Sequence, residues 1–80
     1  MMIKLTKAAE KDLKKSEHNM RQFLIQNLYK IAADPALGKS LKGTLKKYNS
    51  FHCSFTGIRY RIIYRIDTES KSIIVVMKNP

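Results

Sequence analysis

Residues 58–66, IRYRIIYRI, alternate between two kinds of side chain, and this alternation constrains the fold more than any other stretch. Successive side chains of a β-strand point to opposite faces of the sheet, so the pattern predicts one strand with two unlike faces. One side carries Arg59, Arg61 and Arg65, interrupted only by Ile63, and the other side carries an apolar set. A guanidinium grips phosphate through two hydrogen bonds, so the arginine row is either a solvated face or a phosphate-binding one. The apolar set consists of Ile58, Tyr60, Ile62, Tyr64 and Ile66.

The remaining sequence predicts two helices and three further strands. The strongest helical pattern runs from Glu17 to Ala33, where apolar residues recur with a helical period, and it ends before Pro35. A shorter helix is expected from Lys7 to Lys15, with Thr6 as its N-cap and with Ser16 as a cap for the second helix. The strands are expected at Met1–Leu5, Tyr48–Thr56, Ile58–Ile66 and Ser72–Lys78.

The connections between the last three strands determine how these strands pair. Thr56-Gly57 and the polar segment 67–71 are both short, and tight connections require antiparallel neighbours. Helices that precede a run of strands are typical of the α+β class. We therefore expect a single domain over residues 1–80, in the order strand, helix, helix, strand, strand, strand. Two N-terminal helices should pack on one face of a small twisted antiparallel sheet and leave the other face open.

The open face should collect the polar side chains of two paired strands. In the strand that precedes the arginines, the apolar set is Phe51, Cys53 and Phe55, and the polar set includes His52 and Ser54. The polar sets of paired strands share one face of a sheet. We therefore expect one surface formed by His52, Ser54, Arg59, Arg61 and Arg65, beside a lysine-rich loop with Lys39, Lys42, Lys46 and Lys47.

The net charge of this chain indicates which classes of partner it can bind. Sixteen Lys and Arg against six Asp and Glu give a formal charge of +10 in 80 residues. Such an excess causes self-repulsion in the folded state and favours a polyanionic partner, whether nucleic acid, an acidic protein or an anionic membrane. A basic protein whose charge serves only solubility is the alternative.

Cysteine usage and hydropathy bear on the compartment. Cys53 is the only cysteine, so no internal disulfide can form, as is usual in the reducing cytoplasm. Because it shares a strand face with Phe51 and Phe55, we interpret it as a structural thiol and not a nucleophile. No apolar run approaches the ~20 residues of a membrane span, and the N-terminus lacks the apolar core of a signal peptide. We therefore expect a cytoplasmic protein with no membrane partner.

Four segments together form a more specific pattern than any of them alone. They are the opening LTKAAEKDLKK, the helix that closes on ADP, the segment SLKGTLKKYNSFHCSF and, above all, YRIIYRID. In this combination the chain resembles the RelE/ParE superfamily of toxins from bacterial type II toxin–antitoxin systems. The resemblance covers essentially the whole chain, and the LKG loop followed by YRIIY favours the RelE branch. Toxins of the RelE type are small basic proteins that cut messenger RNA in the ribosomal decoding site without a metal or another cofactor.

The resemblance also implies roles for individual residues. In such toxins the RNA 2′-hydroxyl is the nucleophile, and the protein supplies acid–base groups and positive charge. Arg61 matches the strand arginine that contacts the scissile phosphate. His52 and Ser54 stand where some members place two lysines, and His52 would take over the proton transfer. The residues left for RNA binding are Ser54, Arg59, Arg65, Lys42, Lys46 and Lys47. The implied partners are an acidic cognate antitoxin, messenger RNA and the ribosome, with operator DNA reached only through the antitoxin.

One departure from the family pattern keeps other functions open. Family members carry an arginine or histidine, and then a tyrosine or histidine, in a tail after the last strand. Here no aromatic or imidazole side chain follows Met77, so this tail is either truncated or lost. The alternatives are a ParE-like inhibitor of DNA gyrase, which needs a protein-binding surface and no RNA chemistry, and a catalytically impaired member. The latter would bind its antitoxin and regulate the operon.

Overall fold

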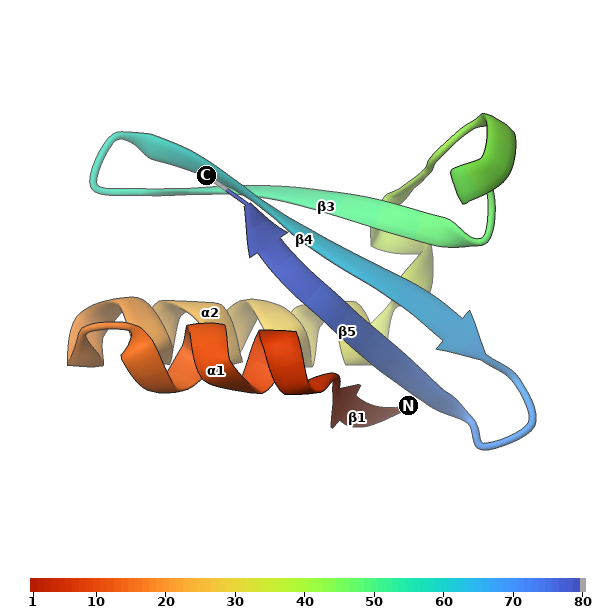
Figure 1. The fold of residues 1–80 in the computed structure, drawn as a ribbon, viewed down its shortest axis with the longest axis horizontal. Helices are drawn as coiled ribbons and strands as arrows, with labels where there is room; N and C mark the ends of the chain where they lie inside the picture. The colour runs from red at the N-terminus through yellow and green to blue at the C-terminus, as the bar shows by residue number, and fades with distance from the viewer. Residues whose placement is uncertain (80) are drawn as a thin grey trace.

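Two helices lie against one face of a five-stranded sheet in the computed structural model of the chain (Figure 1). The structure describes residues 1–79, with the surroundings of the side chains given for residues 1–76. Strand β1 (Met2–Leu5) leads into α1 (Lys7–Lys15) and α2 (His18–Ala33). The elements that follow are η1 (Pro35–Leu37), β2 (Lys39–Ser40), η2 (Gly43–Leu45), β3 (Tyr48–Phe55), β4 (Ile58–Asp67) and β5 (Ser72–Asn79), where η marks a short 3-10 helix.

The sheet has the strand order β1-β5-β4-β3-β2 and combines two kinds of pairing. Strands β3, β4 and β5 pair antiparallel in succession, as their short connections predict. The two-residue strand β2 lies in the segment expected to be a loop, and it pairs antiparallel with β3. β1 instead runs parallel to β5, with Met2 opposite Ser72 and Leu5 opposite Val75. No turn joins these two strands, so no local signal in the sequence sets their relative direction. The α+β class and the two helices on one face are confirmed, and the sheet is mixed because of β1.

Caps explain where both helices begin and end. Thr6 is the N-cap of α1, and its hydroxyl accepts a hydrogen bond from a backbone N–H of the first turn at 3.2 Å. The cap of α2 is Glu17 and not the expected Ser16, because the Glu17 carboxylate accepts from the Asn19 N–H at 2.8 Å. The Ser16 hydroxyl instead donates to the Asp12 carbonyl at 2.7 Å and closes α1.

The core forms between the helices and the inner face of the sheet. α2 supplies one half of it with Met20, Leu24, Leu28 and Ile31. The sheet supplies the other half with Ile62, Tyr64, Ile73 and Val75. Ile62 and Tyr64 come from the middle of the alternating apolar row and are buried, whereas Ile58 and Ile66 at its ends remain exposed. The predicted apolar face is therefore confirmed where the helices cover it.

The buried hydroxyl of Tyr64 ties the segment after α2 to the centre of the sheet. It donates to the Pro35 carbonyl at 2.6 Å and accepts from the Gly38 N–H at 3.0 Å. A Cβ atom at Gly38 would collide with this ring, at 2.8 Å from Cε1. Glycine is required here by the close approach, and the contact sets the point at which the chain enters β2.

A two-residue turn closes the β3–β4 hairpin. Thr56 and Gly57 both have positive φ, 49° and 81°, which is the geometry that matches the twist of paired strands. Phe55 and Ile58 face each other across this turn, and the register of the whole hairpin follows from that pair. The strand expected to reach Thr56 therefore ends at Phe55.

One extra residue, Val76, interrupts the pairing of β5 with β4. Tyr64 pairs with Val75, but the residue before Tyr64 pairs with Met77. The Val76 carbonyl accepts from the Thr6 hydroxyl at 2.9 Å, and the Val75 carbonyl accepts from the Thr6 N–H at 3.0 Å. This bulge therefore fastens the beginning of α1 to the sheet.

Candidate functional site

The predicted polar residues of β3 and β4 lie in register on the sheet face that points away from the helices. His52 is directly opposite Arg61, and Ser54 is directly opposite Arg59. In a two-residue hairpin the closing pair, here Phe55 and Ile58, is hydrogen-bonded, and hydrogen-bonded and non-hydrogen-bonded pairs then alternate along the strands. Both pairs of this site are therefore of the non-hydrogen-bonded kind, whose Cα atoms are about 4.5 Å apart. Side chains approach most closely in such pairs. We call His52, Ser54, Arg59 and Arg61 the hairpin cluster.

All four side chains of the hairpin cluster are exposed. Within residues 1–76 the single ion pair joins Lys14 to Glu10 on α1, so no carboxylate neutralises either arginine of the cluster. Two adjacent uncompensated guanidinium groups create a positive potential that attracts anions. The cluster can therefore hold a phosphate in a guanidinium fork and present an imidazole beside it.

A shallow depression at the cluster is lined by His52, Cys53, Ser54 and Arg59. Cys53 is half-buried, with its side chain packed against the core. Burial raises the pKa of its thiol, an effect that the positive charge of Lys30 partly offsets. Because the thiolate and not the thiol is the nucleophile, the interpretation of Cys53 as a structural residue holds.

Arg65 and the lysine loop form a second group at the other end of β3. Arg65 is half-buried and lies opposite Tyr48. The ammonium group of Lys47 lies 5.4 Å from the centre of the Tyr48 ring, in cation–π geometry. Four residues of strand, roughly 13 Å, separate Tyr48 from His52. The structure thus places the predicted cations in two groups along one face and not around a single point.

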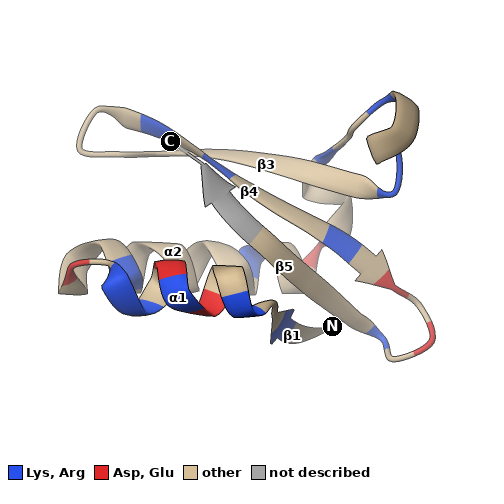
Figure 2. Cartoon of the chain, viewed as in Figure 1, with Lys and Arg blue, Asp and Glu red and all other residues tan. Residues whose placement is uncertain are grey.

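The cations of this second group differ in their surroundings. Asp67, two residues after Arg65, has a pKa below its ordinary value, chiefly because the Ser70 hydroxyl donates to it at 2.8 Å, and Arg65 makes a smaller contribution. The carboxylate of Asp67 therefore offsets part of the positive charge of Arg65. Lys42 and Lys46 flank η2 and are exposed. Figure 2 shows these charges spread along β4 and the segment before β3.

The middle of this sheet face is less polar than the sequence suggests. Ser50 pairs with Ile63 between the two groups of cations. It is 3% exposed, and its hydroxyl has no hydrogen-bond partner in the described part of the chain. Ile63 is half-buried. Its position within the arginine row of the sequence already indicated a less polar segment at this point of the face. The pair of Ser50 and Ile63 therefore separates the hairpin cluster from Arg65.

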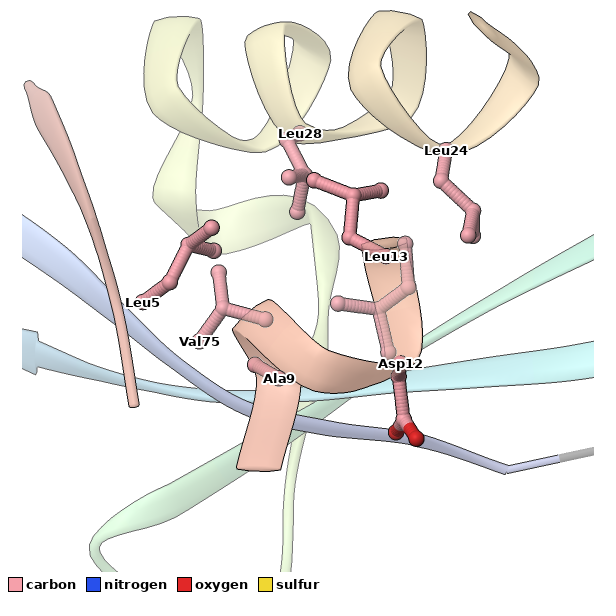
Figure 3. Close-up of a pocket in the computed structure, with 8 residues that line it drawn as sticks. Leu5, Ala9, Asp12, Leu13, Leu24, Leu28 and Val75 are labelled. Atoms are coloured by element: carbon pink, nitrogen blue, oxygen red, sulfur yellow. The ribbon is translucent and has the colours of Figure 1, made fainter. Parts of the chain in front are cut away.

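A different cavity lies on the helical side of the sheet, between α1, α2 and β5 (Figure 3). It measures about 30 Å³ and is apolar apart from Asp12, whose carboxylate points away from the aliphatic side chains. An apolar gap of this size offers no group for catalysis, so we assign it to imperfect packing. The other lining residues are Leu5, Ala9, Leu13, Leu24, Leu28, Ile62 and Val75.

The described residues contain neither a group of metal-ligating side chains nor a membrane-spanning helix. No three His, Cys, Asp or Glu side chains among them are grouped so that they could hold a metal ion. None of the helices there is long and apolar enough to cross a bilayer. The expectation that the catalytic tail is either truncated or lost concerns positions after Met77, which lie outside the described side chains.

Comparison with solved structures finds the same fold among toxins and toxin–antitoxin complexes. A chain of the RelBE2 complex from Mycobacterium tuberculosis matches with a TM-score of 0.84 at 22% identity, over 98% of this chain and 94% of that chain. The isolated RelE toxin of E. coli gives 0.79 at 19% identity, over 98% and 81%. The archaeal RelE–RelB complex from Pyrococcus horikoshii OT3 gives 0.70 at 18% identity, over 99% and 92%. At such identities these matches establish the fold.

Sequence comparison adds the family. Among curated protein sequences, none matches the chain significantly. A family model does match, and it is described as the ParE toxin of the type II toxin–antitoxin system, parDE. It spans residues 3–77, which is nearly the whole chain. The chain therefore belongs to the ParE toxin family, within the RelE/ParE superfamily of toxins from type II toxin–antitoxin systems.

Proposed function

We propose that this toxin is a metal-free endoribonuclease that cuts messenger RNA at the ribosome. The observation that carries the proposal is the register of the β3–β4 hairpin, which sets His52 opposite Arg61 and Ser54 opposite Arg59 on an exposed face. Phosphodiester cleavage without a metal needs groups that move protons and positive charges that stabilise the phosphate in the transition state. An imidazole beside two uncompensated guanidinium groups can supply both.

Each member of the hairpin cluster has a role in this mechanism. Arg61 forks onto the scissile phosphate and stabilises the charge that develops there. His52, directly opposite, takes the proton of the RNA 2′-hydroxyl, whose oxygen attacks the phosphorus. The P–O5′ bond then breaks, which leaves a 2′,3′-cyclic phosphate, and the departing 5′-oxygen takes a proton from solvent. Ser54 and Arg59, nearer to the hairpin turn, bind the adjoining sugar and phosphate. Because paired strands hold all four residues, the backbone positions from which their side chains extend are set before RNA binds.

The second group of cations extends the same site along the RNA. Arg65, Lys42, Lys46 and Lys47 lie toward the end of β3 that is roughly 13 Å from His52. At that distance they would hold the backbone of neighbouring nucleotides and not the phosphate that is cut. Each phosphate contact of this kind adds salt dependence to binding without reading the base sequence.

An acidic antitoxin is the second partner that we propose. The net charge of +10 favours an acidic protein as strongly as it favours RNA. The similar structures from Mycobacterium tuberculosis and Pyrococcus horikoshii are toxin–antitoxin complexes. In this proposal the toxin acts in the cytoplasm and reaches operator DNA only through its antitoxin.

One observation favours a second function. The family model that matches the chain is that of ParE toxins, and resemblance to the ParE branch implies an inhibitor of DNA gyrase. Such an inhibitor acts through a protein-binding surface and needs no cleavage chemistry. The alignment of His52 with Arg61 would then have no catalytic role.

Inducible expression in bacteria, followed by mapping of messenger RNA ends, separates the two functions. A nuclease produces new ends within codons soon after induction, and the Arg61→Ala variant should lose them. A gyrase inhibitor leaves messenger RNA intact and damages DNA. Lys14→Ala is the matched control for the loss of one charge, because Lys14 is exposed and already paired with Glu10. Intact messenger RNA in cells that accumulate the wild-type toxin would contradict the nuclease.

A further inference from the structure

A second basic surface lies on the helical layer, away from the arginines of β4. Lys7, Lys11 and Lys15 are exposed and follow one another at intervals of four residues, so they lie along one side of α1. The helix turns Ala9 and Leu13 toward the core, which leaves these lysines on its outer side. We call the three residues the lysine stripe. The mechanism proposed above does not use it.

No carboxylate of a described side chain forms an ion pair with the lysine stripe. The ion pair of α1 joins Glu10 to Lys14 at 3.3 Å and is the single one in the described chain. Like charges four residues apart destabilise a helix, and Lys7 also stands at the first residue of α1, where the helix dipole disfavours a positive charge. A nine-residue helix has little intrinsic stability to offset these terms. A polyanion bound along α1 would turn the same repulsion into attraction.

The lysine stripe and the hairpin cluster point in different directions. α1 packs on the inner face of the sheet, mainly against β5 (Figures 1 and 2). The hairpin cluster lies on the outer face, because His52 and Ser54 alternate with Cys53 and Phe55, which pack against the core. The sheet and a helical layer therefore stand between the two surfaces. One extended strand of RNA cannot contact both unless it bends around the whole domain.

We propose that the lysine stripe binds the backbone of double-stranded RNA while the hairpin cluster receives a single strand. This inference rests on the proposed function, since it adds a second RNA contact to the same toxin. Lys7 to Lys15 span about 12 Å of straight helix, a length over which a duplex presents several phosphates. Lysine ammonium groups bind phosphate as point charges, and duplex RNA is recognised by its shape and backbone.

The test measures binding of the purified chain to two probes by fluorescence anisotropy over a range of salt concentrations. One probe is a duplex of 2′-O-methyl RNA, and the other is a single strand of the same length, so neither probe carries the attacking hydroxyl. The stripe variant combines Lys7→Gln, Lys11→Gln and Lys15→Gln, and glutamine keeps the helix propensity of lysine. The matched control removes the same charge from the loop with Lys42→Gln, Lys46→Gln and Lys47→Gln.

The stripe variant should bind the duplex about tenfold more weakly at 0.1 M salt, and its salt slope should fall by about two to three, one for each lost phosphate contact. Its affinity for the single strand should stay within about twofold of the wild type. The loop variant should show the reverse pattern. The unfolding temperature of the stripe variant should change little, because the substitutions remove the repulsion between the lysines and also the favourable position of Lys15 in the last turn of α1.

Three results would overturn the inference. Equal losses of duplex affinity in both variants would mean that only net charge matters. Unchanged duplex binding by the stripe variant would show that the duplex binds elsewhere. Polyglutamate serves as a third probe, which represents an acidic protein. If the stripe variant loses binding to polyglutamate while its duplex binding is unchanged, the stripe binds an acidic protein and not RNA. A failure of the proposed nuclease would appear separately, as uncut messenger RNA in cells that express the wild type.

Discussion

Arg61 and Tyr64 lie three residues apart on β4 and point to opposite faces of the sheet. Arg61 is exposed and has no neutralising carboxylate in the described chain. Tyr64 is fully buried, and its hydroxyl both donates and accepts a hydrogen bond. A substitution at Arg61 therefore tests the chemistry of the outer face, and a substitution at Tyr64 tests the fold beneath it.

Arg61→Ala should lower the rate of RNA cleavage by about 10²–10³, because it removes a positive charge that stabilises the transition state. Arg61→Lys should restore only part of the rate, since an ammonium group lacks the two-pronged geometry. Single-turnover cleavage in a translating extract is the measurement. Arg65→Ala is the control, because it removes an equal charge at the other end of β3 and should reduce the rate much less. A wild-type rate in Arg61→Ala would place the reaction elsewhere.

The alkaline limit of stability should depend on Tyr64. Burial raises the pKa of its phenol, the hydrogen bond from Gly38 opposes this, and the charge of Asp34 adds to it. The folded state then keeps this proton to a higher pH than the unfolded state does, so the free energy of unfolding falls as pH rises through and beyond about 10. Tyr64→Phe should flatten this decline in urea titrations between about pH 9 and 11.

Cys53 must be replaced by alanine in both proteins of this comparison. Burial also raises the pKa of its thiol, so it contributes a decline of the same sign. Tyr29→Phe is the control, because Tyr29 is 66% exposed. An alkaline decline of equal slope in Tyr64→Phe and in its parent would show that other groups cause it.

At the scale of secondary-structure elements, the features that local sequence patterns determine were predicted well. The features that depend on contacts between distant segments were not predicted. The helices and the β3–β4 hairpin follow from periodicity and from the Thr56-Gly57 turn, and the hairpin register brings His52 opposite Arg61. The direction of β1 and the bulge at Val76 depend on contacts between distant segments, which no local pattern encodes. Similarly, the alternation predicted which cations share a face, but their division into two groups depends on where the loop before β3 lies.

The entry of the chain into β2 should depend on the contact between Gly38 and Tyr64. Gly38 has a φ of −78°, which alanine adopts freely, so Gly38→Ala tests the steric contact alone. We expect it to reduce the free energy of unfolding by about 1–3 kcal/mol through overpacking. Tyr64→Phe should cost about 1–3 kcal/mol, because it leaves the Gly38 N–H and the Pro35 carbonyl without their partner.

The two substitutions together should cost less than the sum of their separate effects, because removal of the hydroxyl relieves the closest contact of the new methyl group. Urea titration of the four proteins measures this coupling. Strict additivity would mean that the segment adjusts around alanine without meeting the ring.

At the scale of the whole molecule, charge and apolar surface are distributed differently. The net charge of +10 is shared between the helical layer and the open sheet face. Exposed apolar side chains also occur on several elements, among them Met2, Tyr29, Leu37 and Leu45. An antitoxin that covers both kinds of surface would gain affinity from the apolar contacts and speed of association from the charge.

The complex with an acidic antitoxin should therefore survive moderate salt. Raising the ionic strength from about 0.05 to 0.5 M shortens the screening length, so the association rate should fall steeply. The dissociation rate should change little, because buried apolar contacts control it. Surface plasmon resonance at several salt concentrations measures both rates. Complete dissociation at moderate salt would indicate an association held by charge alone.

The strand order has a consequence for how the chain acquires its shape during synthesis. β5 comes last of the five strands but lies inside the sheet, between β1 and β4. β1 has no partner until β5 arrives, because its register joins Met2 to Ser72 and Leu5 to Val75. Contacts between such distant segments form slowly, after local helices and hairpins. A nascent chain that has not yet released residues 72–79 would therefore present an open core, so a partner that binds during translation would meet an incomplete sheet and not the finished surface.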